Sequence, residues 1–529
     1  WKFCRSTLAM TSGKFYWETT SPSAPNSSNG YQTGYAVSSL ALDVNINANS
    51  TGYWGRQDAN KYANGTNTSP WSNTSQGDIL AFAYDADNEK LYHAINGSWK
   101  DSADPANGTN PNWTSVTRGG FAMGGSYGSS LNVIANFGQK PFKYAPPEGF
   151  RPLNYANLPS PGVVRPDQYV GITTWSGNGS GAARKIEQNF DFNPDLIWAK
   201  TRSGADYHNN VWDTVMGFSG GCLITDENYV QTAPGGSPSG GSVSGASAGF
   251  ITWAATGSGA YSDAWYNDNT FSYINWCWKA GGSKDTFNVD DVGYASAAAA
   301  GLTAGTLTIG GASVGTKQGF SIIKYAGSGS NSLFPHGLTQ TPDFYIIKCL
   351  DVGVESWRVY HKSIGATKYL TLNTNDTAVD SNIIFNDTEP TSTTASVYAG
   401  YDGVNNTGRN YIAYLWHDVP GLQKFGMYEG NDNADGPYVE LGFRPAIIIV
   451  KNIDASQNWV IVDDQRDPYN VAKNTLRPNS ALIGYSNNDF ADFLSSGFKF
   501  RGDEGQWNAA ETYIYAAWAH QPMNNLYGG

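Results

Sequence analysis

SYINWCWKAGG, residues 272–282, returns in altered form as NYIAYLWHD at residues 410–418 and as TYIYAAWAH at residues 512–520. Each copy reads Tyr-Ile-x-x-x-Trp. Successive side chains of a strand point to opposite faces of its sheet, and both faces of these copies are largely apolar. A strand with two apolar faces is central and covered on both sides. We therefore expect the shared Trp to fill a sandwich core; the alternative is a platform on which a sugar stacks.

A second shared landmark lies upstream of each copy, where a Pro precedes a Lys by six positions. The pairs are Pro194–Lys200, Pro342–Lys348 and Pro445–Lys451. The apolar run inside each pair predicts a buried strand that begins just after the proline. We expect the Lys at the end of this strand to extend its charged head to water or to pair with a carboxylate.

The repeat divides the chain into modules. Its landmarks recur in the same order with a period of about 100–150 residues, which is the size of a whole domain. We expect an extended string of four β-sandwich domains: residues 1–160, a first module at 165–282, a second module at 319–421 and a third module at 422–529. Residues 283–318 are rich in Ala, Gly and Thr, which predicts a connector or a β-arm rather than part of a core.

The composition favours an all-β protein. Only 15% of the 529 residues are charged, whereas 14% are aromatic and 61 are glycines, so helix formers are scarce and turns are common. The net charge of −12 argues against nucleic acid and anionic membranes as partners, and no apolar run is long enough to insert into a bilayer. The four cysteines lack the spacing of a zinc site. The sequence begins at Trp1, and we expect it to start within a longer protein.

The first 160 residues carry landmarks of their own. SGKFYWET at 12–19 is a Gly followed by an aromatic strand, and residues 77–99 alternate as a β-hairpin does, with turns at DADNEK and at Asn-Gly. NFGQKPFKYAPPEGFRPL follows at 136–153. These stretches resemble the SPRY domain family, which implies a two-sheet sandwich of the concanavalin A-like kind that binds through its loops and has no shared catalytic residues. The Asn- and Ser-rich stretch 44–76 departs from the pattern, and we expect an enlarged loop there.

The repeated modules, together with residues 285–305, are similar to modules of virion proteins from marine bacteriophages. The similarity rests on the Pro-Asp-[LF]-[IV] strand with its Lys, the Trp strand, Ser-x-Gly-Phe and the Tyr-Ile-x-x-x-Trp strand. It implies tandem lectin-like sandwiches, concanavalin A-like or jelly-roll in fold, in a tail fibre or another appendage. From it we expect a receptor-binding adhesin on the virion surface, assembled in the host cytoplasm. Its expected partners are host-surface glycan or protein, other virion proteins and further copies of itself, a trimer by analogy.

Candidate ligand-binding residues are aromatic side chains in loops, because a sugar binds through an aromatic face together with Asp and Asn hydrogen bonds. Aromatic-x-Gly elements upstream of the three prolines supply Trp175, Tyr325 and Tyr428, and the loops of the first 160 residues supply Trp71 and Trp99. Several weak sites held together raise avidity by about 10²–10⁴.

One stretch suggests a calcium site, the only cofactor that we expect. GNDNADG at 430–436 places Asn431, Asn433 and Asp435 at alternate positions before a glycine, like the front of a calcium-binding loop. The closing acidic residue of such a loop is absent, because position 442 holds Gly442. The alternative is structural, since Asn and Asp side chains cap turns by themselves.

The sequence does not predict an enzyme. A glycan-cleaving hydrolase needs two carboxylates facing one bond, and the pattern Glu-x-Asp-x-x-Glu is absent. Asp463-Asp464 and Asp503-Glu504 are adjacent pairs, which point to opposite faces of a strand. No serine nucleophile elbow and no paired zinc histidines occur. Besides the hydrolase, the alternatives to a phage adhesin are a structural or decoration protein of the virion without a ligand, and a secreted bacterial adhesin.

Overall fold

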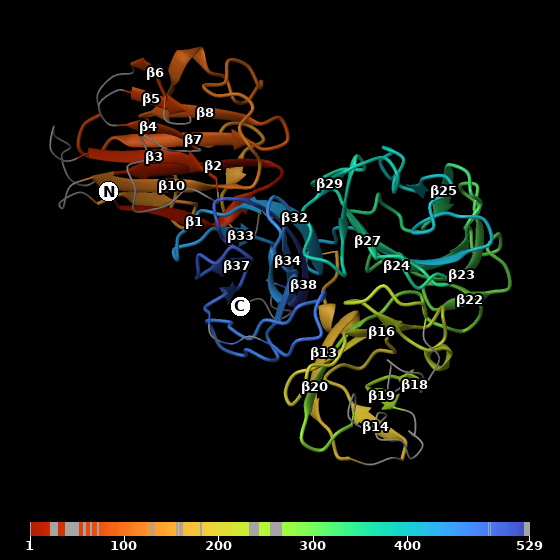
Figure 1. The fold of residues 1–529 in the computed structure, drawn as a ribbon. Coiled ribbons are helices and arrows are strands. Elements are labelled where there is room, and N and C mark those ends of the chain that lie inside the picture. Colours follow the sequence, from red (N-terminus) through yellow and green to blue (C-terminus); the bar gives the residue numbers. More distant parts are fainter. Residues whose placement is uncertain are drawn as a thin grey trace. The chain divides into compact units, whose positions relative to one another are not determined.

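The computed structural model describes residues 2–21, 30–37, 52–56, 60–63, 66–70, 74–127, 132–154, 157, 162–179, 182–231, 243–253, 267–484, 486 and 488–522. Nearly all regular structure in these residues is strand, which confirms the all-β fold class. The chain divides into two compact units (Figure 1), Trp1–Pro159 with Asp435–Gly442 and Ser160–Ala434 with Phe443–Gly529. Among the described helices, none has the length and apolar character that a membrane crossing needs.

The first unit contains two six-stranded sheets. One consists, in order, of β1 (Lys2–Met10), β10 (Gly120–Tyr127), β3 (Gly30–Ala36), β4 (Gly52–Arg56), β5 (Asn60–Ala63) and β6 (Thr66–Pro70). The other consists of β11 (Ile134–Asn136), β2 (Lys14–Thr20), β7 (Ile79–Asp85), β8 (Lys90–Ile95) and β9 (Ser98–Trp99), with β12 (Arg151–Pro152) paired to β2. The short η1 (Lys100–Ser102) follows β9, and β33 (Tyr438–Glu440) lies in the later segment of this unit. Buried aromatic side chains fill the space between the sheets, where Tyr35 and Tyr84 meet at 4.7 Å.

Two sequence predictions for this unit have clear outcomes. The hairpin at 77–99 is confirmed, because β7 pairs with β8 and β8 turns back onto β9. The enlarged loop expected at 44–76 is wrong, because β4, β5 and β6 lie in this stretch and extend one sheet. These strands are short and rich in polar residues, so they lack the apolar pattern by which a strand is recognised in a sequence.

Each module of the second unit contains a large sheet, and four strands of that sheet have the same order. In the first module these strands are β13 (Val170–Ser176), β20 (Ser272–Trp278), β15 (Leu196–Thr201) and β16 (Asn210–Asp213). In the second module they are β24 (Phe320–Ala326), β31 (Asn410–Trp416), β26 (Phe344–Cys349) and β27 (Arg358–His361). In the third module they are β32 (Gln423–Glu429), β38 (Thr512–Pro522), β34 (Phe443–Asn452) and β35 (Val460–Asp463). The Tyr-Ile-x-x-x-Trp strand is second in each order, between two partners. The prediction of a central strand is therefore confirmed.

Further strands complete these modules. The large sheets continue into β17 (Leu223–Ile224) in the first module, and into β28 (Lys368–Thr371) and β29 (Val379–Asp380) in the second. The smaller sheet of the first module contains β14 (Arg184–Glu187), β19 (Phe250–Trp253) and β18 (Val243–Ser247). In the second module, β25 (Ser332–Pro335) pairs with β30 (Thr394–Val397). In the third module, β37 (Gly497–Phe500) pairs with β36 (Ala491–Leu494). The short helices are η3 (Pro166–Gln168) and η4 (Phe218–Gly220). In the first two modules, residues of the smaller sheet share a buried cluster with one face of the large sheet, as a sandwich requires.

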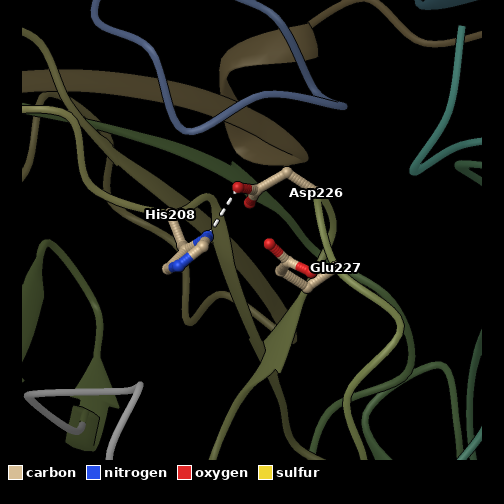
Figure 2. Close-up of side chains that lie close together, drawn as sticks. All are labelled: His208, Asp226 and Glu227. Carbon is tan, nitrogen blue, oxygen red and sulfur yellow. Dashed lines mark hydrogen bonds and ion pairs between the residues drawn. The ribbon is translucent and has the colours of Figure 1, made fainter. Parts of the chain in front are cut away.

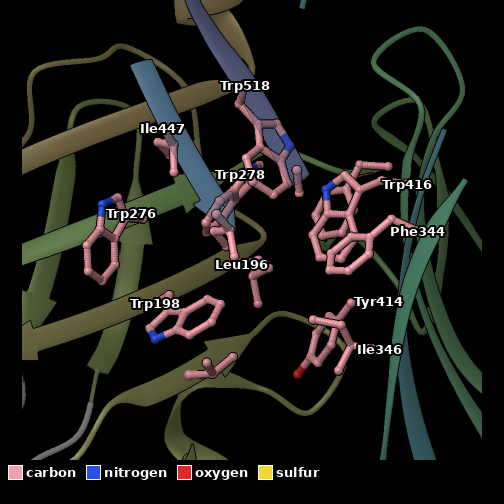
Figure 3. Close-up of a cluster of buried hydrophobic side chains, with 14 of the residues drawn as sticks. Leu196, Trp198, Trp276, Trp278, Phe344, Ile346, Tyr414, Trp416, Ile447 and Trp518 are labelled. Atoms are coloured by element: carbon pink, nitrogen blue, oxygen red, sulfur yellow. The ribbon is translucent and has the colours of Figure 1, made fainter. Parts of the chain in front are cut away.

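The opposite faces of the three large sheets share a single core. Trp278, Trp416 and Trp518, the last residues of the repeated pattern, meet there edge to face (Figure 3). Their ring centroids are 6.4 Å apart between Trp278 and Trp416, 5.4 Å between Trp278 and Trp518, and 6.0 Å between Trp416 and Trp518. We call these three residues the tryptophan triangle. The modules thus form one unit around a common core, and the extended string expected from the sequence is wrong for them.

The segment 283–318 is part of the second module rather than a connector. It forms β21 (Phe287–Val289), β22 (Val292–Tyr294) and β23 (Thr308–Gly315), which join the edge of the large sheet at β24. Leu302, Leu307 and Val314 are buried in that module's outer core. These strands agree with the expected β-arm, whereas the connector and the exclusion from a core are wrong, because the Ala, Gly and Thr bias conceals the few apolar anchors.

The repeated lysines join each module to a neighbour. Each is fully buried, and its Nζ donates to one carbonyl of its own module and one of another. The cross-module pairs are Lys200 with Ala481 O, Lys348 with Asn228 O, and Lys451 with Asn375 O. These contacts run from the first module to the third, from the second to the first and from the third to the second, which closes a ring. The expected water-exposed or carboxylate-paired Lys is therefore wrong, and burial lowers the pKa of all three to about 8.

A second ring of hydrogen bonds follows the same direction. Its members are Asn209 Nδ2 to Ser480 O at 2.9 Å, Trp357 Nε1 to Ile224 O at 2.9 Å, and Trp459 Nε1 to Thr371 O at 3.0 Å. The three donors occupy the equivalent position, just before β16, β27 and β35. Two rings of polar contacts thus fix the orientation of modules that the tryptophan triangle holds together.

Replacing Trp416 by Ala should lower the free energy of unfolding of the second unit by about 3–5 kcal/mol, because the cavity lies where all three modules meet. Denaturant unfolding followed by far-ultraviolet circular dichroism measures the change. Met427→Ala is the control, since that side chain is 46% exposed and should cost no more than about 0.5 kcal/mol. Equal losses in the two variants would contradict the shared core.

Lowering the pH should weaken the contact between the second and third modules, because the neutral ring of His361 contributes to it. This buried ring donates from Nε2 to Tyr515 O and accepts at Nδ1 from Ser363 N, so both nitrogens are satisfied in the neutral form. Burial lowers its pKa to about 3, whereas the unfolded chain takes up the proton near pH 6.5. The stability contributed by neutral His361 is therefore present above about pH 6.5 and lost as the pH falls toward the folded pKa.

Melting temperatures of the native chain and of His361→Gln, measured from pH 7.5 to pH 5, check this expectation. The native chain should lose more stability over the interval than the variant, since only the native chain has this proton to take up on unfolding. Parallel curves would show that His361 does not make this contribution.

Candidate functional site

A polar groove of about 790 Å³ lies in the second unit, where the ends of several segments meet. It is lined by Arg165, Asp167, Gln168, Tyr169, Gln188, Asn189, Phe190, Asp191, Phe192, Asn193, Ala248, Lys279, Ala280, Asp290, Asp291, Lys317 and Gln318. These residues come from the start of the first module, from the loops after β14 and β20, and from the turns β18–β19, β21–β22 and β23–β24. We call this site the polar groove.

Most charged side chains of the polar groove are held by a partner. Arg165 binds Asp167 through two nitrogens, with Nε 2.8 Å from Oδ1. Lys279 Nζ lies 2.7 Å from a carboxylate oxygen of Asp291. Asp290 accepts from the backbone and hydroxyl groups of Thr316, at 2.8 and 2.6 Å. The walls are thus fixed before any ligand arrives, which reduces the entropy that binding must overcome.

Three further side chains of the polar groove are Tyr169, Lys317 and Gln188. Tyr169 is half-buried, and Lys317 Nζ lies 5.9 Å from the centre of its ring. Gln188 is buried and donates from Nε2 to Ile186 O, but its Oε1 has no hydrogen-bond donor within the described part of the chain. A buried acceptor without a donor is costly unless a ligand or water supplies one. A hydroxyl group matches this acceptor, and the C–H face of a sugar matches the tyrosine ring.

The aromatic-x-Gly residues predicted to bind a sugar are buried, and this prediction is corrected. Trp175, Tyr325 and Tyr428 each stack on the Tyr of the repeated central strand, at centroid distances of 4.4, 5.2 and 5.1 Å respectively. The hydroxyls of Tyr325 and Tyr428 donate to the carbonyls of Val404 and Trp507, both at 2.7 Å. No ring face remains for a sugar, so these three side chains belong to the module cores.

The glycine of each aromatic-x-Gly element is required by close packing against a backbone carbonyl. A Cβ at Gly177, Gly327 or Gly430 would lie only 1.9, 2.2 or 1.8 Å from a backbone carbonyl oxygen. Side chains cannot approach that closely, so the strand needs glycine where it passes the neighbouring loop. The repeated element is therefore explained by packing at both of its fixed positions.

The other predicted ligand residues lie in the first unit. Trp99 is half-buried at β9, where it packs against a cluster that includes Tyr16 and Phe150. Its role in binding stays a prediction. Trp71 lies outside the described residues.

The calcium prediction is likewise not decided. Asn431 N donates to Asn508 Oδ1 at 3.0 Å, and Asn508 Nδ2 donates to Asn433 O at 2.8 Å, so Asn508 holds this turn. Asn431 and Asn433 belong to the second unit, whereas Asp435 belongs to the first. Calcium binding by these residues stays a prediction.

A different group of potential metal ligands lies close together in the fold. Among the described His, Cys, Asp and Glu residues, His208, Asp226 and Glu227 have one ligand atom each within 4.8 Å of the others (Figure 2). The sequence analysis did not single out these residues. They are separated by a strand pair and show no metal-binding spacing along the chain.

Sequence reasoning also missed the polar groove. Its residues are contributed by separate segments, of which 188–193 is the longest, so no local motif contains the whole groove. The adjacent acids Asp290 and Asp291 were one available signal, but they lie in the segment that was interpreted as a connector. Only the pairing of β21 with β23 places them beside Tyr169 and Lys279.

Comparison with known proteins identifies a family and solved structures that are similar to the chain. No curated protein matches the chain. The crystal structure of the SPRY domain of human HERC1 is similar, with 20% sequence identity, 26% of this chain and 84% of that domain covered, and a TM-score of 0.21. The family described as Domain of unknown function (DUF7483) matches residues 165–522, a range that contains all three Tyr-Ile-x-x-x-Trp strands. Because this match spans more than half of the chain, the protein belongs to the DUF7483 family.

Proposed function

We propose that this protein is an adhesin whose polar groove binds a glycan on the surface of a host cell. The observation that carries the proposal is the unpartnered Oε1 of buried Gln188, which lines the same groove as the half-buried ring of Tyr169. The prearranged Arg165–Asp167 and Lys279–Asp291 pairs add further hydrogen-bonding groups for sugar hydroxyls. Protein as the receptor is less favoured, because the groove is concave and polar rather than a flat apolar patch.

The location on a virion is proposed from the sequence resemblance to bacteriophage modules. On that basis the protein is a receptor-binding part of a tail fibre or of another appendage. The residue after each tryptophan of the triangle differs between the modules, being Lys279, His417 and Ala519, and of these three only Lys279 lines the polar groove. Multivalency therefore comes from copies of the chain in an oligomer, not from the three modules within it.

A structural component of the virion is the second candidate. Its support is the burial of the repeated side chains: the triangle, the lysines and the aromatic residues of the aromatic-x-Gly elements are all buried. Residues retained in every module thus serve assembly, as a rigid spacer needs. The two candidates differ in whether purified protein binds an envelope.

Tyr169→Ala should weaken retention of the chain on washed envelopes from a panel of marine bacteria by about tenfold, as expected for the loss of one ring contact of about 1.4 kcal/mol. Gln188→Ala should also weaken retention, because the sugar hydroxyl loses its acceptor. Tyr469→Ala is the matched control, since that ring is 84% exposed and does not line the groove. Isolated polysaccharide should compete with the native chain for the envelope.

Two results would contradict the proposal. If the folded native chain is retained on no envelope, the structural role is favoured. If it is retained but Tyr169→Ala and Gln188→Ala behave like Tyr469→Ala, the polar groove is not the site. Loss of retention in Trp99→Ala would then place the site in the first unit.

A further inference from the structure

A cluster of three potential metal ligands lies on the first module. His208 lies in the loop before β16, and Asp226 and Glu227 follow β17. Because β16 pairs with β17, with Asn210 opposite Ile224, the two loops leave the sheet side by side. Figure 2 shows the imidazole and the two carboxylates directed toward one another.

Asp226 is the fixed member of this cluster. Its side chain is 2% exposed, one oxygen lies 2.6 Å from His208 Nδ1 and the other accepts from Asn209 N at 2.8 Å. The side chain of His208 is 21% exposed, so solvent reaches the imidazole. The cluster is therefore rigid on one side and open on the other, as a site with exchangeable water ligands needs.

We propose that His208, Asp226 and Glu227 bind a divalent transition-metal ion, for which Zn²⁺ is the suitable probe. Imidazole together with carboxylates suits zinc and its neighbours, whereas calcium and magnesium take oxygen ligands. The ion displaces the proton shared by His208 and Asp226 to solvent. The contact between Nδ1 and Oδ2 must then open from 2.6 Å to about 3.3 Å, the separation of two ligands around zinc.

The charges around the cluster suit a cation. Asp206, Asp226 and Glu227 contribute negative charge, and Lys200 is the positive group that faces them. The ammonium of Lys200 is held by the carbonyls of Tyr207 and Ala481. It therefore balances only part of this charge, and the ion supplies the rest in place of the imidazole proton.

The position of the cluster implies a stabilising role. The backbone carbonyl of Glu227 accepts from Trp357 Nε1 of the second module at 3.2 Å. Asn209, next to His208, donates to Ser480 O of the third module at 2.9 Å. An ion that joins these two loops fixes the first module's contacts with both neighbours.

Isothermal titration of Zn²⁺ into the chelator-treated full chain, combined with melting temperatures, tests the proposal. Glu227→Gln is the principal variant, because the backbone bonds of Glu227 to Ile224 and Trp357 do not involve its carboxylate. His208→Gln is the second variant. Glu187→Gln is the matched control, an exposed glutamate on β14. The native chain and the control should bind one ion and melt at a higher temperature with Zn²⁺.

Both ligand variants should bind Zn²⁺ at least about tenfold more weakly and lose the rise in melting temperature. The proposal is overturned if the native chain binds no ion, or if Glu227→Gln binds as tightly as Glu187→Gln. If His208→Gln does not fold, Glu227→Gln decides alone, since that substitution preserves the hydrogen bond between His208 and Asp226.

Discussion

The meeting of Trp278, Trp416 and Trp518 is the contact on which the second unit depends. Each ring belongs to the central strand of a different large sheet, and each is nearly inaccessible to solvent. Three edge-to-face ring pairs exclude water from a place where all three modules meet. Each module therefore buries two faces of its large sheet, one against its own smaller strands and one against its neighbours.

This arrangement explains why the repeat retains so few residue types at fixed positions. The triangle requires Trp, and the ring of lysines requires a long side chain whose donor reaches two carbonyls. The aromatic-x-Gly element requires glycine, because the strand passes close to a backbone carbonyl there. All three requirements come from packing: between modules for the triangle and the lysines, and within a module for the aromatic-x-Gly element. The polar groove and the cluster at His208 lie instead in loops, where the modules differ, which agrees with the usual division between a rigid scaffold and variable functional loops.

The sequence predicted which segments form strands better than it predicted what each strand packs against. Apolar faces on both sides of Tyr273–Trp278 placed that strand in the centre of a sheet, because periodicity reports burial directly. Periodicity does not tell whether a face of a sheet is covered by its own module or by a neighbouring one. The sequence therefore led us to expect a separate core for each module, whereas the three modules share one. Lys200 illustrates the same limit: a Lys at a strand end is usually solvated, and only the carbonyls of Tyr207 and Ala481 allow it to be buried.

The candidate sites were the least predictable part. Trp175, Tyr325 and Tyr428 were interpreted as loop aromatics because a glycine follows two positions later, yet that glycine marks close backbone packing. Tyr169, Gln188 and Lys317 come from separate segments and meet only in the folded chain. Burial of an unpartnered acceptor such as Gln188 Oε1 has no signature in the sequence at all.

A double-mutant cycle between Trp278 and Trp416 tests the shared core most directly. The free energies of unfolding of the native chain, Trp278→Leu, Trp416→Leu and the double variant give the coupling between modules one and two, since Leu removes the ring. The shared core predicts a coupling of about 0.5–1.5 kcal/mol, the value of an aromatic pair beyond its burial. Effects that add to within about 0.3 kcal/mol would show that the two rings do not share a core.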